Sequence, residues 1–268
     1  TKVPSKMRTD GGGILRYSYC DPAFIMGTPM TAARPLKDWA AISSQNRWQG
    51  VIFAGEHDAR IIPIVRPKDN RRALNAQWSV QSKGSLITQK LKHHRGGAEM
   101  IVWMSKKGLS APEEEGGVVF VEAKGAYAAI RVAKGGFKWM TGKFKTDRFI
   151  PENSTMILNE EYAPVILEVM AKSDVSSFDA FMAKVKACPI RMNGPVLEYE
   201  TIYGEQLTFD TSTREVPTIN GHPVNYAPKK VFESPFLNAN WNSGVVTITK
   251  GNRKKVLNFE SGNSAQGK

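Results

Sequence analysis

The chain has 268 residues, of which 41% are hydrophobic and 23% charged, so it can bury a substantial core, which argues against global disorder. Lysine and arginine total 37 against 25 acidic residues, and the formal net charge is +12 at pH 7. This excess favours a polyanionic partner, with a merely solvated basic surface as the alternative. No stretch approaches the ~20 consecutive apolar residues of a membrane-spanning helix.

The chain is expected to consist of many short strands. Apolar or alternating segments recur throughout, separated by Gly, Pro, Asn and Asp, a rhythm typical of antiparallel strands. The predicted strands are Ile14–Cys20, Trp48–Ala54, Arg60–Val65, Ser85–Leu91, Glu99–Met104, Val118–Glu122, Tyr127–Val132, Pro164–Met170, Val196–Glu200, Gln206–Phe209, Val231–Glu233, Val245–Thr249 and Lys255–Phe259. More than ten strands are too many for one flat sheet, so two packed sheets follow.

Local turns support antiparallel pairing, because parallel strands need long crossovers. Asn220-Gly221 is the dipeptide that best tolerates positive φ in a two-residue hairpin loop. Lys250-Gly251-Asn252 indicates a second, closing hairpin. The fold class predicted is all-β: a two-layer antiparallel β-sandwich forming a single domain over residues 1–268, with a linker at 1–12 and a loose tail at 261–268.

One short amphipathic helix is predicted near residues 176–188. Ser176 is a candidate cap, and Phe178, Phe181, Met182 and Val185 recur at helical spacing before Pro189. An apolar stripe of this kind normally packs on its own domain, although a partner-binding face is the alternative.

The clearest basic cluster surrounds Lys92, His93, His94 and Arg95, at a predicted hairpin tip before Gly96-Gly97. Arginine and lysine at such a tip bind sulfate or carboxylate groups, and histidine adds charge in mildly acidic conditions. The alternative is a solvated turn. Lys106-Lys107 follow the next strand, at its opposite end if the hairpin is simple.

A polar segment with an aromatic residue precedes a buried-looking strand. Asn46, Arg47 and Trp48 combine an amide, a cation and a ring, the composition that a glycan cleft uses for stacking and hydrogen bonding. Trp48 as a core anchor is the alternative. Trp139 lies in the basic region 134–145 and is the other candidate ligand platform, whereas most remaining tryptophans are expected to pack in the core.

No catalytic or cofactor motif is recognisable. The chain has no phosphate-cradling loop and no dinucleotide-binding glycine pattern, and Cys20 and Cys188 lack metal-ligand spacing. We expect neither cofactor nor metal, and free buried thiols, with a single disulfide as the alternative. The acidic run Glu113–Glu115 is predicted to be a solvated hairpin tip, with calcium binding as the alternative. The catalytic residues, if any, are unknown.

Three stretches together resemble a known family: Ser43 to Ala54, the strand-to-helix segment 163–187, and Phe232 to Phe259. Their order is similar to the C-terminal β-sandwich region of large bacterial polysaccharide-degrading proteins of the heparinase II/III type, in which a helical toroid precedes the sandwich. The resemblance implies a two-layer or supersandwich-like β domain, a secreted or periplasmic location, and an active cleft shared with an upstream toroid. No run of paired helices is present here, so we expect a piece of a longer protein or a separate chain.

Three functions remain open. The first is binding of an acidic polysaccharide through basic and aromatic groups. The second is a polysaccharide lyase acting by β-elimination, in which Tyr127, His93 or His94 is the base and Arg95 or Arg47 neutralises the uronate carboxylate. The third is nucleic-acid binding, which has only the net charge in its favour, because no zinc finger, helix-turn-helix or RNA-binding aromatic motif is present.

Overall fold

A computed structural model describes residues 16–29, 49–55, 59–67, 77–92, 98–140, 153–225, 230–240 and 243–259. The chain divides into two compact units. Within the described residues we call 16–224 the sandwich unit and 225–259 the C-terminal sheet. The organisation of residues 1–268 as one domain stays a prediction, and the expected linker at 1–12 and tail at 261–268 lie outside the described residues.

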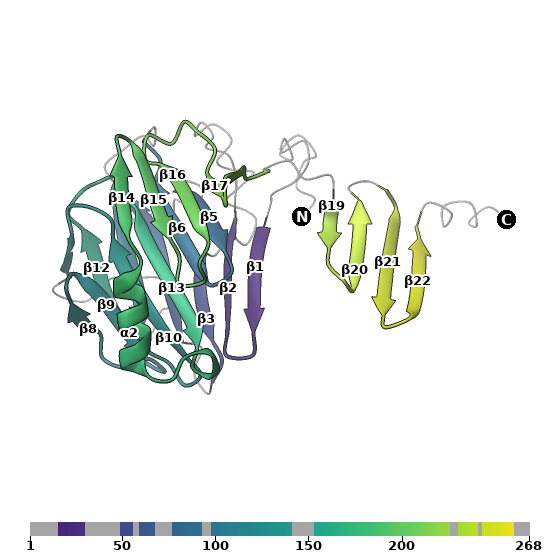
Figure 1. Ribbon diagram of the computed structural model, residues 1–268, viewed down its shortest axis with the longest axis horizontal. Coiled ribbons are helices and arrows are strands. Elements are labelled where there is room, and N and C mark those ends of the chain that lie inside the picture. The colour runs from purple at the N-terminus through teal and green to yellow at the C-terminus, as the bar shows by residue number, and fades with distance from the viewer. Residues whose placement is uncertain are drawn as a thin grey trace. The chain divides into compact units, whose positions relative to one another are not determined.

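Two antiparallel sheets form the body of the sandwich unit (Figure 1). The first sheet has the strand order β1 (Arg16–Asp21), β2 (Phe24–Pro29), β3 (Gly50–Phe53), β4 (Arg60–Pro67), β7 (Ala98–Ser105), β12 (Asn153–Leu158) and β11 (Phe137–Trp139). The second has the order β5 (Gln77–Ser82), β6 (Ser85–Lys90), β13 (Val165–Ala171), β10 (Ala126–Val132), β9 (Val118–Glu122) and β8 (Glu113–Glu115). The predicted all-β sandwich is therefore confirmed.

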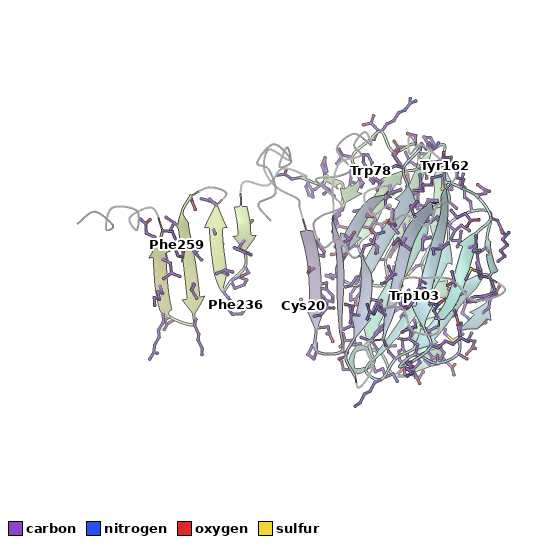
Figure 2. The ribbon with its side chains drawn as sticks, turned by 180° about the vertical axis from the view of Figure 1, so that it is seen from behind. Cys20, Trp78, Trp103, Tyr162, Phe236 and Phe259 are labelled. Carbon is purple, nitrogen blue, oxygen red and sulfur yellow. The ribbon has the colours of Figure 1, made fainter. Side chains whose placement is uncertain are left out.

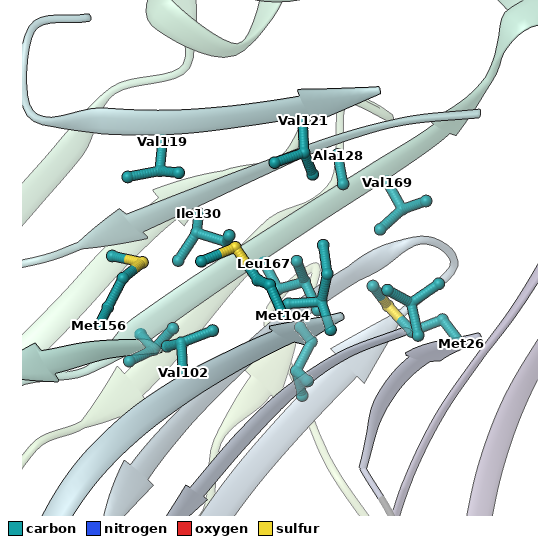
Figure 3. Close-up of a cluster of buried hydrophobic side chains, with 14 of the residues drawn as sticks. Met26, Val102, Met104, Val119, Val121, Ala128, Ile130, Met156, Leu167 and Val169 are labelled. Carbon is teal, nitrogen blue, oxygen red and sulfur yellow. The ribbon is translucent and has the colours of Figure 1, made fainter. Parts of the chain in front are cut away.

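The core lies between these sheets. Met26, Val102 and Met104 of the first sheet pack in one buried cluster with Ile130 and Leu167 of the second (Figure 3). Alternate residues of a strand point to opposite faces, so the apolar alternation along each strand places one set of side chains in this cluster. Burial of each such side chain contributes about 1.5–3 kcal/mol to folding.

A third layer covers the outer face of the second sheet. It contains a short 3-10 helix η3 (Lys172–Asp174), the helix α2 (Phe178–Ala187) and the strands β14 (Ile190–Asn193), β15 (Val196–Glu200), β16 (Gln206–Asp210), β17 (Thr218–Ile219) and β18 (His222–Pro223). Figure 1 shows α2 and β14 to β16 in front of β10 and β13. This cover explains why every residue of β13 is buried: one set of side chains faces the core and the other set faces the third layer.

The helix α2 confirms the predicted amphipathic segment. Phe181, Met182 and Val185 are buried, and the rings of Phe178 and Phe181 pack on Tyr127 of β10 with centroids 5.1 and 5.7 Å apart. The cap is Ser177 and not Ser176: the Ala180 amide donates to Ser177 Oγ at 3.1 Å. The stripe packs on its own unit, which makes its role structural.

The C-terminal sheet is a four-stranded antiparallel meander. Its strands are β19 (Lys230–Glu233), β20 (Leu237–Asn240), β21 (Val245–Lys250) and β22 (Arg253–Asn258). Lys250 pairs with Arg253 across a two-residue turn, as the glycine-containing sequence predicts. The other predicted hairpin is also present, with Asn220 and Gly221 both at positive φ.

One local prediction is wrong, and a second is correct only in part. Strands β6 and β7 form no hairpin, because β6 pairs with β5 and β13 while β7 pairs with β4 and β12 in the other sheet. Glu113–Glu115 are solvated as predicted, with all three side chains exposed, but they form the edge strand β8 next to the turn at 116–117 and not the hairpin tip itself.

The two cysteines are free, as expected, but Cys20 is exposed and only Cys188 is buried. Among the helices that the structure describes, none has the length and hydrophobicity needed to cross a bilayer.

Candidate ligand-binding end of the sandwich

Several strands of both sheets end at the same end of the sandwich unit. In the first sheet Gly27 lies opposite Gly50, and Pro67 lies opposite Ala98. In the second sheet Gln77 lies opposite Lys90. We call this the loop end, because the connections spanning residues 30–48, 68–76 and 93–97 all run between strand ends located there.

A set of buried polar side chains ties the two sheets together near the loop end. Gln49 and Gln77 both donate through Nε2 to the Pro63 carbonyl, at 2.9 and 3.2 Å. Ser79 donates to Gln49 Oε1 at 3.1 Å and lies 2.8 Å from the Thr88 hydroxyl. We call these five residues the polar seam. These buried polar groups are hydrogen-bonded to one another and do not depend on water for partners. The seam therefore joins β4 to β5 and β6.

Lys90 ends β6 with a fully buried side chain. Its ammonium group forms an ion pair with the half-exposed Glu161 carboxylate and lies 5.2 Å from the centroid of the Tyr162 ring. A buried ammonium group requires such partners, since desolvation of an unpaired charge is costly. Lys90 is therefore a structural cation that positions Glu161 and Tyr162.

Lys92 is the exposed member of the same cluster. Its ammonium group lies 6.0 Å from the Tyr162 ring centroid, and the Tyr162 hydroxyl donates to the Lys92 carbonyl at 3.4 Å. Burial, and secondly the charge of Glu161, raise the pKa of Tyr162, so its hydroxyl stays protonated near neutral pH. We call Lys90, Lys92, Glu161 and Tyr162 the cationic–aromatic cluster; it can offer a cation beside a ring to an anionic ligand.

A second ion pair fixes the neighbouring turn. Lys134 forms an ion pair with Glu160 at 3.0 Å, and the Asn159 side chain donates to the Gly135 carbonyl at 2.9 Å. A Cβ atom on Gly135 would lie 2.5 Å from Glu160 Cγ. The turn after β10 and the connection before β13 thus hold each other in place beside Tyr162.

Trp139 occupies a different position from this cluster. It lies on β11, at the edge of the first sheet, and is 36% exposed. Its ring packs edge-on against Phe137 at 5.6 Å, and its Nε1 donates to Glu114 at 3.3 Å. Part of the ring is available for a ligand, while its N–H joins the edges of the two sheets through β8.

The structure locates only part of the sequence-predicted site. Asn46, Arg47, Trp48, His93, His94 and Arg95 lie outside the described residues. Gln49 directly follows Trp48 in the chain, and Thr88 lies four residues before Lys92. Gln49 Nε2 is 3.4 Å from Thr88 Oγ1. The motif at residues 46–48 therefore precedes, and the motif at residues 92–95 follows, strands whose ends lie close together.

Glu168 is a buried ionisable residue that sequence reasoning missed. It lies in β13 under the third layer, with no exposed surface, and accepts a hydrogen bond from Ser85 Oγ at 2.5 Å. Burial raises the pKa of Glu168 to about 7, against the lowering effect of the hydrogen bond from Ser85, the nearby Tyr199 hydroxyl and the charge of Arg131. A glutamate in the otherwise apolar run from Val165 to Ala171 was the available signal.

Arg131 joins this buried group to the third layer. It donates to the Cys188 carbonyl at 2.7 Å, and its guanidinium carbon lies 5.7 Å from the Tyr199 ring centroid. Burial, and then the charge of Glu168, raise the pKa of Tyr199 strongly. The group is shielded from water and holds two layers together, so we assign it a structural role.

The proposed general base Tyr127 is also mostly covered. Only 8% of its surface is exposed, with Phe178 and Phe181 packed on its ring and the Lys172 ammonium 5.0 Å from the centroid. The Tyr127 ring therefore serves to pack α2 against β10. The described part of the chain also contains no group of three or more His, Cys, Asp or Glu side chains arranged to hold a metal ion.

Comparison with known proteins adds no relative: no family model, no curated protein and no solved structure matches this chain.

Proposed function

We propose that the sandwich unit binds an acidic polysaccharide at its loop end, as the β-sandwich part of a secreted or periplasmic carbohydrate-active protein. The observation that carries the proposal is the convergence of strand ends there, beside the cationic–aromatic cluster. The three connections that join these ends contain seven lysines and arginines against two aspartates. The sequence that joins these strand ends is therefore strongly basic, and such charge attracts a polyanion.

The cluster itself suits a carboxylated or sulfated sugar. Lys90 is already paired with Glu161, so the exposed Lys92 is the cation that an incoming anion would meet. Tyr162 supplies a ring beside that cation, and a ring can stack on the apolar face of a sugar. Charge and stacking surface together favour acidic glycan over a purely electrostatic partner.

A paired substitution tests this proposal. In Lys92→Gln/Arg95→Gln, we expect the dissociation constants for heparin and for polygalacturonate to rise about tenfold, because two charge-assisted hydrogen bonds are lost. Isothermal titration calorimetry on the full chain measures the change. Neutral dextran serves as the uncharged comparison and should bind neither protein measurably.

The matched control is Lys106→Gln/Lys107→Gln. These two exposed lysines follow β7 at the end opposite the loop end, and the substitutions remove the same charge. Equal losses in the two variants would show that only net charge matters and would contradict the proposed site. A rise in ultraviolet absorbance from unsaturated sugar would instead establish a lyase, and tight binding to DNA without glycan affinity would establish the nucleic-acid alternative.

A further inference from the structure

The C-terminal sheet has one apolar and one polar face. The strand register places Phe232, Leu237, Ile248 and Leu257 on the same face. The opposite face is built mainly from amide, hydroxyl and charged side chains, namely Glu233, Asn238, Asn240, Thr247, Thr249, Lys254 and Asn258, and also carries Val245 and Val256. Phe232 and Ile248 remain 50% and 39% exposed. The apolar face is therefore open to solvent within the described residues.

Three cations gather at the turn end of this apolar face. Lys250 lies directly opposite Arg253, and Lys255 lies two residues further along β22, opposite Ile248. All three side chains are exposed, and no carboxylate among the described residues lies within ion-pair distance of them. Like charges directly opposite each other on a sheet destabilise it. A bound anion would offset this repulsion.

An exposed aromatic ring lies at the same end. Phe236 is 68% exposed, and its carbonyl accepts the backbone N–H of Thr249 at 2.8 Å, one residue before Lys250. Ser234 Oγ accepts the amides of Phe236 and Leu237 at 3.2 and 2.9 Å, which fixes the turn. Figure 2 shows Phe236 and Phe259 at opposite ends of the sheet. The turn thus holds the Phe236 backbone next to Thr249, at the same end of the sheet as the three cations.

We infer that Phe236, Ile248, Lys250, Arg253 and Lys255 form a second binding site, for an anionic sugar unit of a sulfated or uronate polysaccharide. The guanidinium group of Arg253 binds a sulfate or carboxylate through two parallel hydrogen bonds. Lys250 and Lys255 add charge on either side, and the ring of Phe236 with the side chain of Ile248 covers the apolar face of the sugar ring. We call this the turn-end site.

The composition of the face favours glycan over nucleic acid. Base edges are read by arginine, lysine and amide side chains; the site contains the first two, whereas the amides of this sheet, Asn238, Asn240 and Asn258, lie on the opposite face. Cations next to aliphatic and aromatic groups suit a ligand with alternating anionic groups and apolar ring faces. The turn-end site goes beyond the proposed function, because it belongs to the other unit and shares no residue with the loop end.

The test is Lys250→Gln/Arg253→Gln/Lys255→Gln in the full chain. The dissociation constant for a heparin oligosaccharide is expected to rise about tenfold and to depend less on salt concentration. Phe236→Ala is expected to weaken binding about fivefold without changing the salt dependence, and Phe236→Trp is expected to restore it. Glutamine keeps β22 polar, and an unchanged melting temperature shows that the sheet still folds.

The control is Lys254→Gln/Lys106→Gln/Lys107→Gln, which also removes three exposed cations but none from the apolar face. Retained affinity in the turn-end variant, or an equal loss in this control, would overturn the inference. So would a loss confined to binding of a DNA duplex, or of vesicles containing phosphatidylserine, with heparin affinity intact. Measurement of Lys92→Gln/Arg95→Gln in parallel separates failure of this site from failure of the loop end.

Discussion

The wild-type protein is expected to lose about 3 kcal/mol of unfolding free energy between about pH 4.5 and pH 7, and the Glu168→Gln variant is expected not to show this loss. Burial raises the pKa of Glu168 from its ordinary value of 4.5 to about 7. Between these values the folded state keeps a proton that the unfolded state has lost. The contribution of the protonated Glu168 carboxyl group to the free energy of unfolding is therefore fully present below pH 4.5 and is lost as the pH rises through 7.

Burial makes ionisation of Glu168 costly, and its polar neighbours offset this cost only in part. Ser85 and the Tyr199 hydroxyl lie beside the carboxyl group, and Arg131 is the positive charge acting on it. Arg131 is also engaged with the Cys188 carbonyl at 2.7 Å, so it compensates the carboxylate only in part. Glutamine keeps an acceptor for Ser85 and has no charge at any pH.

Urea unfolding, followed by tryptophan fluorescence at several pH values, measures this effect, since Trp78 and Trp103 are buried. The difference in unfolding free energy between wild type and Glu168→Gln should shift by about 3 kcal/mol in favour of the variant from pH 4.5 to 8. Glu200→Gln, which removes an exposed carboxylate on β15, is the control and should follow the wild type. Parallel curves for wild type and Glu168→Gln would refute the assignment.

Gly50→Ala is expected to cost roughly 3–5 kcal/mol of stability, combining backbone strain with a steric clash. Gly50 has φ of +111°, and an added Cβ would lie 2.1 Å from the Ile61 carbonyl oxygen of β4. Backbone atoms of a paired strand have little room to withdraw. The close approach at Gly50 also sets the position of Gln49, so the clash would disturb the polar seam.

Gly116→Ala isolates the steric part of this effect. Gly116 also has positive φ, +59°, but nothing lies within 4 Å of the added Cβ, so this variant should lose about 1–2 kcal/mol. Thermal and urea unfolding of the two variants give the comparison. If both variants lost the same stability, the contact with Ile61 would not be the cause.

The parts of the fold with local signals were predictable from sequence. The hairpin at Asn220-Gly221 and the helix around Phe181 depend on turn chemistry and on spacing, both of which are properties of a few adjacent residues. The pairing of β6 and β7 was wrong because two neighbouring strands can belong to different sheets. No local pattern distinguishes a hairpin from a connection that crosses between layers.

The sequence indicated the third layer only indirectly. The segment from Val165 to Ala171 is buried on both faces, and an apolar run of this kind indicates a covered strand without indicating what covers it. Glu168 within that run, and the polar residues of β5, acquire their partners only through contacts distant in the chain. Of the predicted site, Lys92 and Trp139 are described, and the structure places them on different parts of the sandwich unit.

The polar seam has a consequence for how the two sheets are aligned. The hydrophobic effect is not directional, whereas the hydrogen bonds from Gln49 and Gln77 to one carbonyl, that of Pro63, require a specific geometry. Shear of the sheets by even one residue step would strand buried amides without partners, at a cost of about 1–3 kcal/mol for each. The polar seam therefore fixes the alignment of the two sheets, and with it the positions of Lys90 and the adjoining strand ends.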